Sequence, residues 1–168
     1  MMKHKGLIIT LIVVVVLAVI AAVIGGAIFL VNLINNTKDP ITSAKFESTM
    51  EKMDFVIYDA GQQYEEYDYI EEAIIAVEED EDFQIEFYVL EDDDSAVSFY
   101  NNNVKIFKNS ASSVKASSTV NFKNGATFKL TSNGKYKMIT RVENTVVYVD
   151  VDSEYKDDVE EIIKKLGY

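Results

Sequence analysis

The sequence predicts an α+β fold: an N-terminal transmembrane helix, then one domain with a mainly antiparallel sheet and helices packed on one face. Three observations support this expectation. A run of 25 residues, from Leu7 to Val31, contains no charged side chain. Beyond it, stretches with the alternation typical of strands outnumber stretches with helical spacing. The connections between them are mostly short, which favours antiparallel neighbours in the sheet.

The apolar run sets the expected domain boundaries. At 1.5 Å per residue, a helix of this length spans roughly 37 Å, against about 30 Å of hydrocarbon in a bilayer. Lys3 and Lys5 precede the run, so the positive-inside rule predicts a cytoplasmic N-terminus. The chain would then be a single-pass protein of the plasma membrane, with an uncleaved signal anchor and the lipid bilayer as a partner. The expected parts are a cytoplasmic tail at 1–6, the transmembrane helix at 7–34, a linker at 35–41 and an extracytoplasmic domain at 42–168.

Two other interpretations of the N-terminus stay open. A cleaved signal peptide needs a shorter apolar core and a small-x-small site, which Asn32-Leu-Ile-Asn35 does not offer. The stretch Lys3-His-Lys-Gly6 resembles the basic leader that prepilin peptidases cut, although Leu11 stands where most pilins carry glutamate. A pilin-like assembly subunit is therefore an alternative for the whole chain.

Small residues recur every four positions inside the apolar run, at Ala18, Ala22 and Gly26. On a helix they would form a narrow stripe where a second backbone can approach, which predicts a weak homodimer through the transmembrane helix. An alanine-rich anchor without a partner would show the same pattern.

The first half of the domain is expected to contain one helix and three strands. Thr42 or Ser43 can cap a helix that runs to about Met53. The strands are expected at 55–58, 70–77 and 83–90, with a polar connection at 60–69 and an acidic turn at 78–82. In the third strand, four apolar side chains alternate and would share one face: Phe83, Ile85, Phe87 and Val89.

The second half is expected to contain two helices and a meander of strands. Asp92, Asp93 and Asp94 stand where a helix would begin, because carboxylates complement its exposed amides. The serine-rich stretch 109–119 is interpreted as a loop or a weak edge strand. Strands follow at about 117–123, 126–131, 135–142 and 145–151, and an amphipathic helix runs from Ser153 to Gly167.

Two Asn-Gly pairs punctuate this meander, Asn124-Gly125 and Asn133-Gly134. Each predicts a two-residue hairpin turn in which both residues take a positive φ. In addition, residues 70–108 and 126–166 share one plan, a hairpin followed by a helix. This pattern indicates either an internal duplication or a general property of α+β units.

Charge is distributed unevenly along this acidic chain, whose net charge is −12. Residues 95–141 contain no acidic residue. The basic residues in that segment are Lys105, Lys108, Lys115, Lys123, Lys129, Lys135, Lys137 and Arg141. They could form a basic face that binds an anionic envelope polymer, or they could pair across strands with the acidic flanks. Nucleic acid is not expected as a ligand, because the chain as a whole is negative.

The composition excludes much of the common catalytic chemistry. There is no cysteine, and His4 in the N-terminal tail is the single histidine. We therefore expect no enzyme, no catalytic residue, no cofactor and no metal site. A calcium loop beginning at Asp150 would need glycine at its sixth position, where Tyr155 stands. A hydrolase or metal-binding domain that uses carboxylates alone is the alternative from another class.

Three tyrosines in the polar connection, Tyr64, Tyr67 and Tyr69, alternate with acidic residues. Amphipathic rings in such a segment could form a contact patch for a protein partner. They could equally pack over the edge of the sheet.

Four stretches of the domain resemble a known group of proteins. They are Arg141-Val-Glu-Asn-Thr-Val-Val-Tyr-Val149, Tyr155-Lys-Asp-Asp-Val159, Leu166-Gly-Tyr168 and Phe83-Gln-Ile-Glu-Phe-Tyr88. The group consists of uncharacterised single-span membrane proteins of low-GC Gram-positive bacteria, so the resemblance implies a bacterial origin and no particular activity. The hypothesis from the sequence is a membrane-tethered, extracytoplasmic and non-enzymatic binding module. Its partner would be a protein or an anionic envelope polymer.

Overall fold

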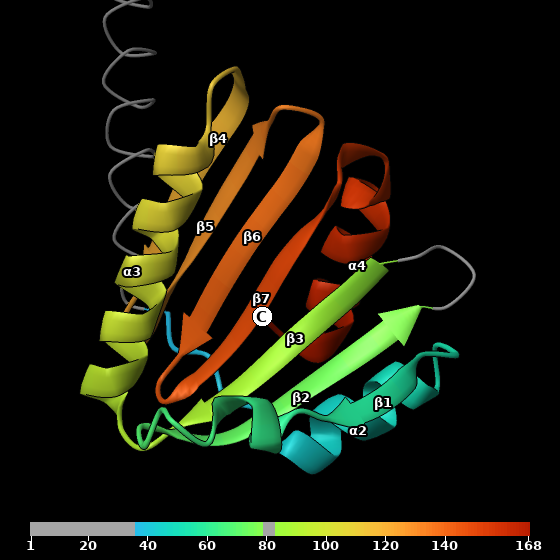
Figure 1. Ribbon diagram of the computed structural model, residues 1–168, viewed down its shortest axis with the longest axis vertical. Coiled ribbons are helices and arrows are strands. Elements are labelled where there is room, and N and C mark those ends of the chain that lie inside the picture. The colour runs from blue at the N-terminus through green and yellow to red at the C-terminus, as the bar shows by residue number, and fades with distance from the viewer. Residues whose placement is uncertain (1–35, 79–82) are drawn as a thin grey trace, which may run out of the picture. The chain divides into compact units, whose positions relative to one another are not determined.

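The computed structural model describes residues 36–78 and 83–168, and residues from Thr37 to Tyr168 belong to one compact unit. Seven strands and three α-helices make up the described part (Figure 1). The strands are β1 (Val56–Asp59), β2 (Ile70–Glu78), β3 (Phe83–Leu90), β4 (Val114–Phe122), β5 (Gly125–Ser132), β6 (Lys135–Val142) and β7 (Thr145–Asp152). The helices are α2 (Ser43–Glu51), α3 (Asp93–Ser110) and α4 (Lys156–Leu166), with short 3-10 turns at Gly61–Tyr64 and Ser153–Tyr155.

All seven strands form one antiparallel sheet in the order β1-β2-β3-β7-β6-β5-β4. The sheet consists of two meanders, β1–β3 and β4–β7, which meet where β3 pairs with β7. Helix α3 carries the chain from β3, near the centre, to β4 at the far edge (Figure 1). The chain then returns strand by strand until β7 lies beside β3.

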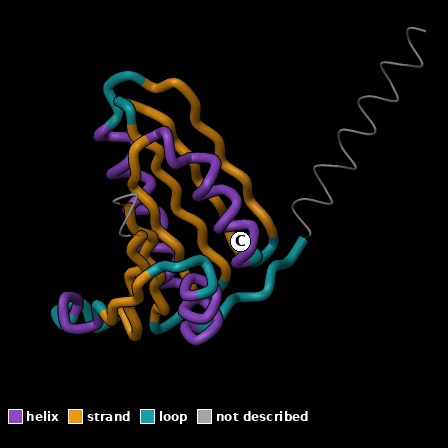
Figure 2. The backbone as a smooth tube through the Cα atoms, turned by 90° about the vertical axis from the view of Figure 1, so that its right-hand side faces the viewer, coloured by secondary structure: helices purple, strands orange, loops and turns teal. Residues whose placement is uncertain are grey.

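Helices cover both faces of the sheet, which corrects the expected packing on one face. Helix α3 packs over one face, and α2 and α4 pack over the other, so Figure 2 shows helices on both sides of the strands. The reason lies in the central strands, which are apolar on both faces. Phe87 and Val147 face α2 and α4, whereas Tyr88 and Val146 face α3. A sheet with two apolar faces needs a layer on each.

The two faces bury separate cores. Under α2 and α4, the rings of Phe46 and Phe87 stack at 4.9 Å, and Met138 is fully buried. Under α3, the ring of Phe107 lies 5.2 Å from that of Tyr148. Strands β3 and β7, at the centre of the sheet, contribute side chains to both cores.

The predicted fold class also included a transmembrane helix, and this is corrected. Within residues 36–78 and 83–168, no helix is both long enough and apolar enough to cross a membrane. The expected single-pass signal anchor is accordingly not among the described helices. The segment 7–34, with the stripe of Ala18, Ala22 and Gly26, lies outside the described residues. The extracytoplasmic location of the domain stays a prediction.

The two Asn-Gly pairs play different roles. Asn133 and Gly134 have φ values of 53° and 78° and form the expected turn between β5 and β6. At the other pair the expectation is wrong, because the turn consists of Lys123 and Asn124, and Gly125 already belongs to β5 without a positive φ. Glycine is needed at position 125 because the backbone of β6 lies close to it: a Cβ on Gly125 would lie 2.1 Å from the carbonyl oxygen of Arg141.

The shared plan of β2-β3-α3 and β6-β7-α4 is not a two-fold repeat. The hairpins lie in reverse order across the β3–β7 pair and run antiparallel. Only a two-fold axis perpendicular to the sheet would superpose them, and that operation leaves both helices on the same face. The helices lie on opposite faces, so the structure favours a general α+β pattern over an internal duplication.

Candidate functional site

A cleft of about 810 Å³ opens on the α3 face of the sheet. Its floor comes from β3 and β7, one wall from the first turns of α3, and the other wall from the segment that connects β1 to β2. The residues that line it are Tyr64, Tyr67, Tyr69, Ile70, Glu86, Tyr88, Asp92, Asp94, Ser95, Ser98, Phe99, Asn102, Asn103 and Tyr148. Six of these side chains are aromatic and three are carboxylic acids, whereas no lysine or arginine is among them.

The aromatic rings stand at steep angles to one another. The rings of Tyr64 and Tyr88 lie 5.4 Å apart at 89°, and those of Tyr67 and Tyr69 lie 5.9 Å apart at 66°. Phe99 of α3 leans on Tyr88 from the other wall, with 5.0 Å between the ring centroids. Rings inclined in this way form corners instead of a flat stack, so they can surround a small group from several sides.

A hydrogen-bond chain runs from one wall to the floor. The Tyr88 hydroxyl donates to Glu86 Oε2, and the hydroxyls of Tyr64 and Tyr88 lie 2.8 Å apart. A phenol carries one proton, so with that proton directed at Glu86, the Tyr64 hydroxyl must be the donor to Tyr88. The other carboxylate oxygen, Oε1, accepts from Gln84 Nε2 at 2.8 Å. Glu86 is therefore held in place by neutral donors.

The floor of the cleft is polar because successive side chains of β3 point to opposite faces of the sheet, and polar ones point into the cleft. Burial raises the pKa of Tyr88, and the charge of Glu86 raises it further, so the hydroxyl stays protonated and able to donate. Burial likewise raises the pKa of Tyr148, which pairs with Glu86 across β3 and β7. Glu86 and Tyr88 share the α3 face because side chains two apart in a strand point the same way.

Asp92, another residue that lines the cleft, has a structural role in α3. It is the N-cap of α3, and its Oδ1 accepts from the Ser95 backbone N–H at 2.7 Å. The hydrogen bonds with Ser95 lower the pKa of Asp92. A general acid requires the opposite shift. Asp94, in the first turn of α3, and Glu86 are the other two carboxylates that line the cleft, and neither is the N-cap of the helix.

The structure brings the three tyrosines of the connecting segment together on one side of this cleft. Tyr64 is half-buried, and Tyr67 and Tyr69 remain 41% and 38% exposed. The sequence singled out these rings, but not Glu86, Tyr88, Phe99 and Tyr148, which complete the site. The available signal was the second face of β3, where Gln84, Glu86 and Tyr88 form a polar stripe opposite the apolar one.

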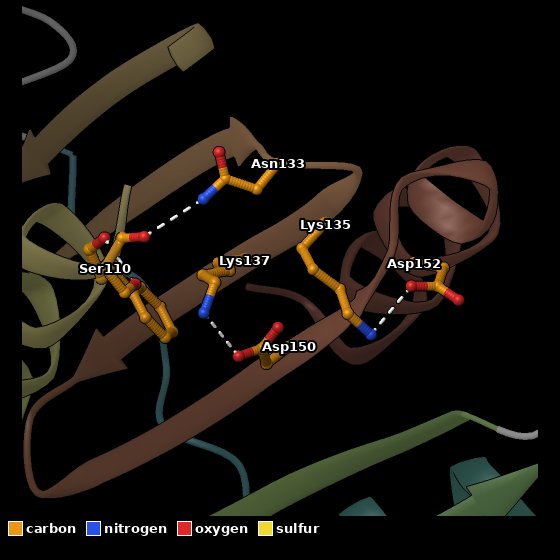
Figure 3. Close-up of polar contacts among 7 residues, drawn as sticks. Ser110, Asn133, Lys135, Lys137, Asp150 and Asp152 are labelled. Carbon is orange, nitrogen blue, oxygen red and sulfur yellow. Dashed lines mark hydrogen bonds and ion pairs between the residues drawn. The ribbon is translucent and has the colours of Figure 1, made fainter. Parts of the chain in front are cut away.

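The basic residues of segment 95–141 do not share one face. Lys135 and Lys137 pair with the carboxylates of Asp152 and Asp150 across β6 and β7, at 2.8 and 2.7 Å (Figure 3). Lys129, from β5, reaches to the opposite face and binds Glu160 of α4 at 3.0 Å. Lys137 also lies 5.2 Å above the Phe107 ring. These contacts favour cross-strand pairing over a surface for a polyanion.

The remaining basic residues of this segment lie at separate places. Lys108 stands over the Phe128 ring at 5.2 Å, and the Arg141 Nη1 donates to the Glu143 carbonyl oxygen at 2.8 Å. Lys105, Lys115 and Lys123 are exposed, on α3, on β4 and in the turn after β4.

Among the described residues, no group of three or more metal-ligating side chains is close enough to hold a metal ion. In the calcium-loop candidate, Asp150 and Asp152 extend from β7 to their lysine partners, and Tyr155 belongs to the 3-10 turn before α4. A loop with converging carboxylates is therefore not formed there.

No family model matches the chain, and no curated protein matches it. Among solved structures, the domain is similar to a GTP-binding regulator from Thermotoga maritima. The identity is 17%, over 76% of this chain and 85% of that one, and the TM-score is 0.43. A likeness of this size carries no argument about function, so the cleft is interpreted from its own residues.

Proposed function

We propose that this chain is a binding module and that its cleft takes an organic cation, such as a primary or quaternary ammonium group. The observation that carries the proposal is the composition of the cleft: six aromatic rings and three carboxylates, with no basic side chain among the lining residues. The proposal keeps the binding role expected from the sequence and gives it a ligand class.

The chemistry of the walls fits a cation better than an anion or a neutral group. A cation over the face of a tyrosine ring gains about 0.5–1 kcal/mol at an exposed site and about 2 kcal/mol when desolvated. The rings of Tyr67 and Tyr69, inclined at 66° and still 41% and 38% exposed, offer more than one such face. Glu86 adds a fixed negative charge at the floor, held by Tyr88 and Gln84. An anionic ligand would meet three carboxylates with no counter-charge.

An anionic envelope polymer is not part of this proposal. Lys129, Lys135 and Lys137 are engaged by acidic partners within 3.0 Å. A polyanion would have to displace these carboxylates, and the overall charge of −12 would oppose its approach.

A pair of isosteric probes tests the proposal. Choline carries a quaternary ammonium group, and 3,3-dimethylbutan-1-ol has the same shape without the charge. The chain contains ten tyrosines and no tryptophan, so intrinsic fluorescence reports directly on tyrosine environments. We expect choline to change the tyrosine emission of the full chain saturably, and the neutral isostere to bind at least about tenfold more weakly. Equal binding of the two probes, or no binding of choline, would contradict the proposal.

A matched pair of variants locates the site. Glu86→Gln removes the floor charge but keeps an acceptor for Tyr88, so choline affinity should fall roughly fivefold. Glu154→Gln changes an exposed acid outside the cleft and should leave the affinity unchanged. An equal effect of the two substitutions would indicate general charge attraction and not a site.

A further inference from the structure

Strand β4 is an open edge of the sheet. Eight of its nine side chains are exposed, and only Phe122 at its end is buried. Val114 and Val120 are 57% and 44% exposed, high values for apolar residues of a nine-residue strand. The opposite edge is different, because β1 has four residues and neighbours α2. Long edges of this kind are templates for another strand unless a protein blocks them.

The direction of the free backbone groups follows from the hairpin. A two-residue turn at Lys123 and Asn124 makes Phe122 and Gly125 a hydrogen-bonded pair. Pairs alternate along an antiparallel ladder. Ser117, Thr119 and Asn121 therefore direct their N–H and C=O groups away from β5, toward solvent. The bulge between Val114 and Ala116 interrupts the ladder near one end of this edge.

We propose that a second copy of this chain pairs with β4 in an antiparallel arrangement centred on Ser118, joining two sheets into one. In this register Ser117 lies opposite the partner's Thr119, and their outward N–H and C=O groups meet as a hydrogen-bonded pair. Ala116 lies opposite the partner's Val120, and two-fold symmetry repeats each contact. The strand is thus complementary to itself.

Charge is compatible with a second copy in this register, because residues 116–121 are uncharged and their pairing brings no like charges together. Lys115 is the single charged residue of β4, and the central register places it opposite the partner's Asn121. Moving the centre to Thr119 would bring Lys115 toward Lys123 in the partner's turn, and like charges close together are unfavourable. At the Phe122 end, Lys38 lies 5.1 Å above the Phe122 ring. The segment from Ala116 to Asn121, which contains no bulge, remains for the pairing.

Cross-linking tests the register directly, because the chain contains no cysteine. At the two-fold axis, residue 118 faces its own copy in a non-hydrogen-bonded pair, where Cα atoms lie roughly 4.5 Å apart, within the range of a disulfide. Ser118→Cys in the full chain should therefore form a covalent dimer on mild oxidation. The control Thr119→Cys, whose copies would be two residues out of register, should form little. Absence of the Ser118→Cys dimer, or faster cross-linking of Thr119→Cys, would overturn the proposal.

A charge exchange tests the pairing without a covalent bond. Ser118→Asp places two carboxylates at the axis and should weaken dimerisation about fivefold, and Ser118→Lys should do the same. A mixture of the two variants should restore a heterodimer. Since residue 118 is exposed, circular dichroism should show both variants folded. Sedimentation equilibrium of the full chain gives the association constants. Unchanged self-association in both variants, or no rescue by mixing, would contradict a β4–β4 contact.

Discussion

Tyr88 contributes to the stability of the fold and lines the cleft of the proposed binding site. It is 3% exposed, and its hydroxyl joins Tyr64 to the Glu86 carboxylate. Because this hydroxyl donates to a charged acceptor, its removal leaves a partly buried carboxylate short of one partner.

We therefore expect Tyr88→Phe to lower the free energy of unfolding by about 2 kcal/mol. Tyr64→Phe removes a hydrogen bond between two neutral groups and should cost about 1 kcal/mol. Urea denaturation followed by circular dichroism measures both values. An equal cost for the two substitutions would contradict the inferred direction of the chain, from Tyr64 through Tyr88 to Glu86.

The contribution of Glu160 to the stability of the fold depends on pH. Burial acts to raise its pKa, but hydrogen bonds from Lys129 and Tyr136 outweigh it, and the net shift is below the ordinary value of 4.5. A carboxyl whose pKa is lower in the folded state stabilises the fold above about pH 4.5. That contribution disappears as the pH falls through the lower folded value.

Glu160→Gln should accordingly lower stability by about 0.5 kcal/mol at neutral pH, a small value because the ion pair is one-third exposed. At pH values below the lowered folded pKa of Glu160, the variant and the parent chain should converge. Denaturation at a series of pH values measures the difference. A stability difference that persists in acid would contradict the role of the carboxylate charge.

At the scale of elements, the two hairpin glycines make a matched comparison. A Cβ on Gly125 meets the Arg141 carbonyl oxygen and the Phe122 ring, so backbone must move. A Cβ on Gly134 meets nothing within 4 Å, but the φ of 78° disfavours a side chain. Gly125→Ala should cost about 3 kcal/mol through overpacking, and Gly134→Ala about 1 kcal/mol through backbone strain. Thermal denaturation should rank them in this order. The reverse order would show that turn geometry, and not close approach, limits this sheet.

Most elements could be predicted from periodicity, because strands such as 83–90 and 135–142 alternate clearly. Strand β4 is the exception, since its serine-rich stretch was interpreted partly as a loop. Its side chains are solvent-exposed, so the strand owes its existence to the hydrogen-bond ladder with β5 and not to burial. A hydrophobic pattern cannot report such a strand.

The cleft could be predicted only in part for a related reason. Tyr64, Tyr67 and Tyr69 are close in sequence and therefore visible as a group. Glu86 and Tyr148 meet because β3 pairs with β7, a contact between strands about sixty residues apart. Pairing between distant strands is a property of the topology, which local patterns do not determine.

At the scale of the whole molecule, buried phenols predict a limit at alkaline pH. Burial is the largest cause that raises the pKa of five tyrosines above the ordinary value of 10, and it raises that of Tyr168 to about 12. The five are Tyr88, Tyr100, Tyr136, Tyr148 and Tyr168. A group with a raised folded pKa stabilises the fold below the unfolded value, and this contribution is lost as the pH rises above it.

The domain should therefore lose stability above about pH 10, with tyrosine ionisation and loss of circular dichroism in one transition. Tyrosinate absorbance and ellipticity, recorded in the same titration, check this coincidence. Tyr58 is 48% exposed, so Tyr58→Phe should leave the transition unchanged. Ionisation of the buried tyrosines well before the loss of ellipticity would contradict the prediction.

The meeting of two meanders at β3 and β7 has a consequence for synthesis on the ribosome. Strands β1 to β3 leave the exit tunnel first, but the edge of β3 finds its partner only when Thr145–Asp152 has been made. The layer formed by α2 and α4 is also incomplete until α4 has been made, because α4 follows β7 in the chain. The meander from β4 to β7 is built of neighbouring hairpins and can form in the order of its translation. The N-terminal strands can then dock on a finished template, so we expect closure of the sheet to follow the synthesis of β7.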